Sequence, residues 1–159
     1  MPARIIEGAP SAAGLAFALV VARYHDFVTS KLEAGALAAL AAAGAAPDAV
    51  TIVRVPGAYE IPIAAQHAAE SGAFSAVVCL GCLIKGETPH FEYIASAVSH
   101  GLTSAAAATG VPMAFGVLTT NSVEEALARA GSGPSNKGWE AAAAAVEMAG
   151  VVAQLSAQK

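Results

Sequence analysis

The densest group of chemically capable residues in this sequence is Gly86-Glu87-Thr88-Pro89-His90. Gly86 and Glu87 lead into a predicted helix for which Thr88 would be the N-cap and Pro89 the first residue. The free amides and positive dipole end of such a helix attract anions, so the pattern predicts a phosphate site. His90, in the first turn, could move protons near neutral pH. The alternative is a partly exposed surface histidine without a role.

Two other loops carry residues suited to binding. Tyr24 follows an apolar run and precedes a helix, where an aromatic ring could stack on a flat heterocycle or simply pack in the core. Gly57 permits a tight turn and close approach of a ligand to the backbone. Glu60 stands at a predicted helix start, where it would either complement the helix dipole or bind a ligand hydroxyl.

Cations for an anion site occur late in the chain. The net charge is −4, with 12 acidic and 8 basic side chains, so an anionic ligand would be repelled at long range and must be held locally. Arg129 can grip phosphate with two parallel hydrogen bonds, and Lys137 begins the last predicted helix. Alone, Arg129 would more often be a solvated residue paired with Glu125.

The two cysteines, Cys79 and Cys82, have C-x-x-C spacing. Cys79 falls in a predicted buried strand and the next helix starts well beyond Cys82, which disfavours a redox pair. Zinc binding is disfavoured because no second pair of ligands accompanies them. Both are predicted to be core or pocket-lining thiols.

The elements that must position these residues alternate between strands and helices. Short apolar runs predict parallel strands buried on both faces, at Leu15–Ala22, Val50–Val55, Ala76–Leu80 and Met113–Leu118. Helices are predicted at about Asp26–Ala43, Ile61–Ser71, Thr88–Thr109, Ser122–Ala130 and Lys137–Leu155. Capping boxes are expected at Ser122–Glu125 and Ser30–Glu33. Arg4–Ile6 could add an edge strand, either to this sheet or to that of a neighbouring subunit. The pattern predicts a doubly wound α/β sandwich with ligands at the carboxyl ends of the strands.

Composition limits the class of protein. The 159 residues predict one domain, 1–159, and 56% apolar against 13% charged residues excludes disorder. The charge-poor segments Ala34–Ala46 and Ala141–Ala153 suggest a subunit interface. No stretch predicts a membrane span or a signal peptide, so a cytoplasmic protein is expected. Nucleic acid is not an expected partner, because Lys and Arg form no cluster.

Five motifs together resemble the 6,7-dimethyl-8-ribityllumazine synthase family of riboflavin biosynthesis. They occur in the family's order and spacing: Asp26–Leu32, Val55–Pro62, Gly81–Tyr93, Phe115–Thr120 and Asn136–Gly138. The resemblance implies a three-layer, four-stranded flavodoxin-like domain in pentamers, which in some members form a hollow shell of twelve pentamers. It implies active sites between subunits, condensation of 5-amino-6-ribitylaminouracil with 3,4-dihydroxy-2-butanone 4-phosphate, no cofactor and no metal. Riboflavin synthase is an implied protein partner.

The resemblance also implies roles for individual residues. His90 would transfer protons, Tyr24 would stack on the pyrimidine and Glu60 would hold ribityl hydroxyls. Further pyrimidine and ribityl contacts are implied for Ala58, Tyr59, Cys82, Leu83 and Ile84, and phosphate contacts for Gly86, Glu87 and Thr88. From a neighbouring subunit, Phe115 would cover the substrate, Arg129 would bind phosphate and Lys137 would reach the pyrimidine.

The sequence departs from the family pattern at a few positions. His25 stands where Asn is frequent, Tyr24 where Phe or Trp is common, and Lys85 where Arg is common. Three other interpretations remain open at this point: a non-catalytic flavin- or lumazine-binding relative, a structural shell protein, and a flavodoxin-like electron carrier.

Overall fold

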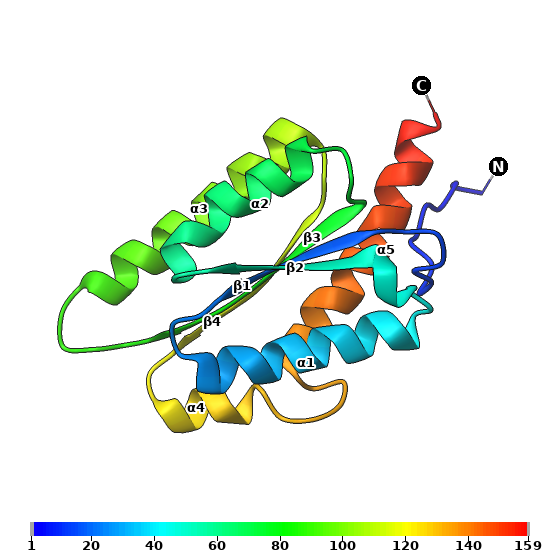
Figure 1. The fold of residues 1–159 in the computed structure, drawn as a ribbon. Coiled ribbons are helices and arrows are strands. Elements are labelled where there is room, and N and C mark those ends of the chain that lie inside the picture. Colours follow the sequence, from blue (N-terminus) through cyan, green and yellow to red (C-terminus); the bar gives the residue numbers. More distant parts are fainter. Residues whose placement is uncertain (1, 159) are drawn as a thin grey trace.

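A four-stranded parallel sheet lies between two layers of helices in the computed structural model, which describes residues 2–158 (Figure 1). The strands are β1 (Phe17–Ala22), β2 (Val50–Val55), β3 (Ala76–Ile84) and β4 (Met113–Thr120), in the order β2-β1-β3-β4. All three pairings are parallel. The predicted fold class is confirmed.

The helices divide between the two faces of the sheet. One face is covered by α1 (Asp26–Ala42) and α5 (Lys137–Ser156), with the short α4 (Val123–Ala128) beside them (Figure 1). The other face is covered by α2 (Ile61–Glu70) and α3 (His90–Thr109). Two 3-10 turns, Pro47–Ala49 and Ala58–Glu60, precede β2 and α2. No helix within residues 2–158 is long and apolar enough to cross a membrane.

The core forms because β1 is apolar on both faces. Its residues are all buried, and they alternate between the two hydrophobic clusters of the molecule. Phe17 and Leu19 belong to the cluster under α1 and α5, whereas Ala18 and Val20 belong to the cluster under α2 and α3. Full burial of a side chain the size of Phe17 or Leu19 contributes about 1.5–3 kcal/mol. The inner strand β1 therefore packs against both helical layers.

Two strands extend further than their sequence predicted. β3 runs to Ile84 instead of Leu80, and β4 runs to Thr120 instead of Leu118. The register pairs Ile84 with Thr120, and the Lys85 amide donates to the Thr120 carbonyl at 2.8 Å. Continuous pairing between the strands thus places in the sheet residues that the apolar run alone left in a loop.

One predicted helix start and one predicted capping box were wrong. α3 begins at His90, and the Tyr93 amide bonds the Pro89 carbonyl, which makes Pro89 the N-cap in place of Thr88. The capping box expected at Ser30–Glu33 does not form, because α1 begins at Asp26, as predicted, and Ser30 lies inside the helix. The Ser122 cap is confirmed, with its hydroxyl accepting from the Glu125 amide at 3.1 Å.

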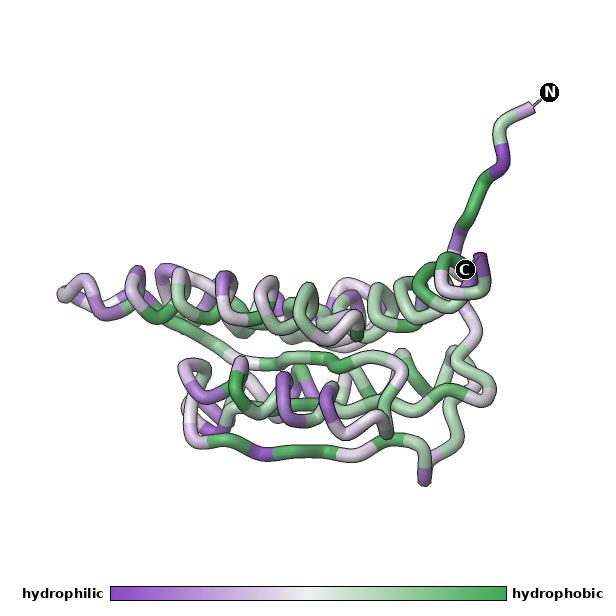
Figure 2. Tube along the Cα trace, turned by 90° about the horizontal axis from the view of Figure 1, so that it is seen from above, coloured by the Kyte–Doolittle hydropathy of each residue, from purple (hydrophilic) through white to green (hydrophobic). Residues whose placement is uncertain are grey.

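The N-terminal segment Arg4–Ile6 carries no regular secondary structure and adds no strand to the sheet of its own chain, whereas the alternative of a strand in a neighbouring subunit's sheet stays a prediction. The segment stands away from the body of the chain near the C-terminal end of α5 (Figure 2). Its contacts there include a 2.7 Å hydrogen bond from Arg4 to Gln158.

Candidate active site

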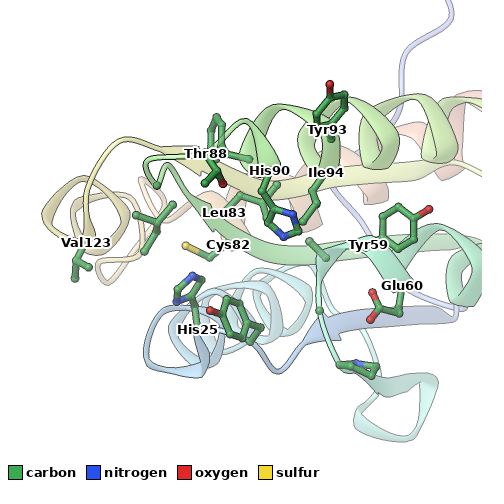
Figure 3. A pocket seen from close by; sticks show the side chains of 17 residues that line it. His25, Tyr59, Glu60, Cys82, Leu83, Thr88, His90, Tyr93, Ile94 and Val123 are labelled. Atoms are coloured by element: carbon green, nitrogen blue, oxygen red, sulfur yellow. The ribbon is translucent and has the colours of Figure 1, made fainter.

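A cavity of about 870 Å³ opens at the carboxyl ends of β1, β2 and β3, bordered on one side by the start of α3 (Figure 3). We call it the first pocket. β2 and β3 lie on opposite sides of β1, so the direction of strand order reverses at β1. Ligands of doubly wound sheets bind at such a reversal. The lining includes these predicted residues: Tyr24, Ala58, Tyr59, Glu60, Cys82, Leu83, Ile84, Gly86, Thr88 and His90.

Tyr24 follows β1 and lies at the mouth of the first pocket. Its side chain is 67% exposed, so the alternative of a core-packing tyrosine is wrong. The ring packs on His25 with 4.3 Å between ring centroids, and His25 also meets Phe27 edge-on at 5.6 Å. One aromatic face thus remains available at the pocket for a flat ligand.

Glu60 ends the 3-10 turn after β2 and precedes the first residue of α2. Its side chain makes no cap hydrogen bond with α2, and neither ion pair within residues 2–158 includes it. Figure 3 shows the carboxylate turned toward the pocket interior. It is therefore placed to accept hydrogen bonds from ligand hydroxyl groups.

The end of β3 forms the floor of the first pocket with Cys82, Leu83 and Ile84. Burial raises the pKa of the Cys82 thiol to about 11 and that of Cys79 to about 12. Both thiols are free and stay protonated at neutral pH. Cys82 therefore presents a small, weakly polar surface to a ligand.

The start of α3 gives the first pocket its anion-binding character. Within the described chain no side chain caps this 20-residue helix, which leaves its first amides open to a ligand. Gly86 and Thr88 line the cavity beside it, whereas Glu87 is exposed and outside the lining. His90 is the first residue of α3, and its ring points into the cavity (Figure 3).

The remaining predicted residues line a second, separate pocket of about 360 Å³ formed by β4, α5 and Arg129 at the end of α4. We call it the second pocket. It contains Phe115, which is 50% exposed on the edge strand β4, together with Arg129 and Lys137. Arg129 donates to the Glu125 carbonyl at 3.2 Å, not to its carboxylate, which corrects the expected side-chain pair. Lys137 forms an exposed ion pair with Glu140 at 2.8 Å.

The groups that could bind an anionic ligand are divided between the two pockets. Among the described residues, the first pocket has the open helix end and His90 but no Lys or Arg in its lining. The second pocket has both cations but no uncapped helix start, because Asn136 caps α5. Neither pocket alone offers both kinds of anion contact.

The first pocket also includes residues that sequence reasoning did not assign to a site: His25, Phe91, Tyr93, Ile94 and Val123. His25 has φ 63° and ψ 45°, a left-handed conformation that Asn and His adopt more readily than most residues. The frequent Asn at this position in the family pattern was the available signal. The apolar residues of this set belong to α3 and α4, and no local sequence pattern predicted that they line a pocket.

Comparison with known proteins agrees with this geometry. A family model described as 6,7-dimethyl-8-ribityllumazine synthase matches residues 14–153. The protein of that name from Syntrophus aciditrophicus (strain SB) is 48% identical over 151 residues, which are 95% of this chain and 98% of that protein. The one from Desulfatibacillum aliphaticivorans is 44% identical over 151 residues, 95% and 97% of the two chains. This chain therefore belongs to the 6,7-dimethyl-8-ribityllumazine synthase family.

Proposed function

We propose that this chain condenses 5-amino-6-(D-ribitylamino)uracil with 3,4-dihydroxy-2-butanone 4-phosphate to 6,7-dimethyl-8-ribityllumazine, with release of phosphate and water, in riboflavin biosynthesis. Family membership over nearly the whole chain supports the activity. The observation that carries the proposal for the site is the division of anion contacts between the two pockets.

The phosphate of the butanone substrate binds at the start of α3, beside Gly86, Glu87 and Thr88. The open amides of this helix provide hydrogen bonds and the positive end of its dipole. Arg129 of a neighbouring subunit completes the site, because the first pocket has no cation of its own. Glu87 contributes through its backbone, since its exposed carboxylate would repel the ligand if it faced inward.

The uracil substrate occupies the other side of the first pocket. Tyr24 stacks on the pyrimidine, and Glu60 accepts hydrogen bonds from ribityl hydroxyls. The backbone and side chains of Ala58, Tyr59, Cys82, Leu83 and Ile84 form the walls around the ring and the chain. From the neighbouring subunit, Phe115 covers the substrate and Lys137 reaches the pyrimidine.

The chain needs to supply no nucleophile for this reaction. The substrate's amine attacks the ketone to form an imine, phosphate leaves, and the ring closes. Holding both reactants in one cavity lowers the barrier by up to about 7–11 kcal/mol in favourable cases. His90 moves protons between the reacting atoms, a contribution that is typically about 10²–10⁴-fold.

The shared site requires a homo-oligomer, and we propose the pentamer of the family, alone or within a larger shell. Exposed apolar side chains near the mouth of the first pocket support a subunit contact there: Tyr59 (66%), Ile63 (64%) and Tyr93 (74%). The enzyme would work in the cytoplasm and hand its product to riboflavin synthase. Neither nucleic acid nor membrane is part of this proposal.

The activity is tested by mixing the purified protein with its two substrates and following the absorbance of the lumazine product. Arg129→Ala tests the phosphate role: we expect a higher KM for the butanone phosphate and a nearly unchanged KM for the uracil. Loss of one charge-assisted contact of about 1.5–3 kcal/mol predicts a rise of about 10- to 150-fold. An unchanged KM for the phosphate substrate would contradict the assignment.

A further inference from the structure

Asn136 is a buried amide whose hydrogen bonds join three separate segments of the chain. Only 2% of the residue is exposed. Its Oδ1 accepts from the amides of Gly138 at 2.7 Å and Trp139 at 3.1 Å, which caps α5. Its Nδ2 donates to the carbonyls of Lys31 in α1 at 3.1 Å and Gly131 at 2.7 Å. Both donors and both acceptor positions of the amide are therefore used.

These bonds enclose the segment that carries the two cations of the second pocket. Arg129 is two residues before Gly131, and Lys137 is adjacent to Asn136. The Lys137 amide donates to the Arg129 carbonyl at 2.9 Å, so the backbones of the two residues are tied directly. The Gly131–Gly133 stretch between them is exposed and includes Gly133 at φ 83°. The amide thus supplies the buried anchor of an otherwise exposed loop.

The side chains of Arg129 and Lys137 have few contacts of their own to hold them. Arg129 is exposed, with one bond to a carbonyl in α4, and the side chain of Lys137 is 42% exposed in its ion pair. Such exposed contacts are weak, so the backbone decides where the two charges stand. A displacement of about 1 Å at a binding group can cost as much as about 10²-fold in rate.

We propose that Asn136 is a positioning residue for the second pocket, acting through Arg129 on binding of the phosphate substrate. The inference rests on the proposed function of that pocket and adds a residue that touches no substrate. In this proposal the two polar atoms of the amide have different roles. Oδ1 stabilises α5, whereas Nδ2 holds the loop that carries the cations against α1.

A second way to move this amide comes from α1. A Cβ at Gly35 would overlap Oδ1 of Asn136 and lie 2.8 Å from its Nδ2, well inside contact distance. Gly35→Ala therefore displaces the amide without changing residue 136. Because Gly35 lines neither pocket, its effect on substrate binding would pass through Asn136.

The experiment compares Asn136→Ser and Gly35→Ala with wild type. Serine keeps a cap acceptor for α5 but has no arm to reach Lys31 and Gly131. We expect both variants to raise the KM for 3,4-dihydroxy-2-butanone 4-phosphate about tenfold. The KM for the uracil should rise less, because Lys137, which reaches the pyrimidine, is the first residue of α5 and is held by that helix. Leu40→Ala, in the core at the far end of α1, is the control, because it lowers the melting temperature without touching the loop.

The outcomes distinguish the inference from the function beneath it. A normal KM for the phosphate substrate in both test variants, with a raised KM in Arg129→Ala, overturns the positioning role and leaves the second pocket in place. A normal KM in Arg129→Ala as well overturns the proposed function of that pocket. An equal rise of both KM values in Leu40→Ala and the test variants would assign the effect to lost stability and also overturn the inference.

Discussion

A site divided between subunits predicts that two defective variants restore each other when their subunits are mixed. His90→Ala removes the proposed proton-transfer group of the first pocket, and Arg129→Ala removes a cation of the second. In a mixed oligomer, a subunit with an intact first pocket can stand beside one with an intact second pocket. That junction carries every residue of the wild-type site.

The size of the recovery follows from the geometry. Both side chains are exposed, so each variant should fold with a change in stability within about 0.5 kcal/mol. His90→Ala loses about 10²–10⁴-fold in turnover and Arg129→Ala about 10- to 150-fold in binding. In a ring of head-to-tail contacts assembled at random from equal amounts, about one junction in four has both halves intact. We expect about 25% of wild-type activity from the mixture.

The assay is lumazine absorbance at a substrate concentration near the wild-type KM, after the two variants are denatured together and refolded. Each variant treated alone is the control for refolding. A mixture of wild type with the His90→Ala/Arg129→Ala double variant is the control for assembly. If the mixed variants show only the average of the two separate activities, the site lies within one chain and the reasoning fails.

Three further predictions concern groups around the pockets. The pKa of Cys82, raised to about 11, predicts that iodoacetamide alkylates this thiol slowly near pH 8 and about tenfold faster with each added pH unit. Rapid labelling of Cys82 at pH 7 would contradict this prediction. Burial lowers the pKa of His25 in the folded chain below its usual value of 6.5. The contribution of the neutral imidazole to stability is therefore full above about pH 6.5 and is lost as the pH falls through the lowered pKa of the folded chain. His25→Asn, which also tolerates the left-handed backbone, should therefore reduce the fall in melting temperature on acidification, and an unchanged fall would count against this. Ser122→Ala removes the cap of α4 and should lower the free energy of unfolding in urea by about 1 kcal/mol, whereas no loss would show that the cap contributes nothing.

Local patterns predicted most of the elements and the loops of the first pocket. The run Val50–Val55 is the observed β2, and the helix predicted from Asp26 ends within one residue of the observed Ala42. Parallel strands with right-handed connections all end at the same edge of the sheet, so the loops after β1, β2 and β3 had to meet there. The separation of Arg129 and Lys137 from His90 was expected only through the family resemblance.

The alternation of short apolar runs with helical segments along the chain determined by itself that this protein is a parallel α/β sandwich with its chemistry at the strand ends, because such patterns are local properties of the sequence. Only the tertiary structure decided features that depend on pairing between distant segments. The pairing of Ile84 with Thr120 sets the ends of β3 and β4. The bond from Asn136 to Lys31 joins residues 105 positions apart and holds the loop of the cations. Such contacts form only when the layers pack, so no short stretch of sequence contains them.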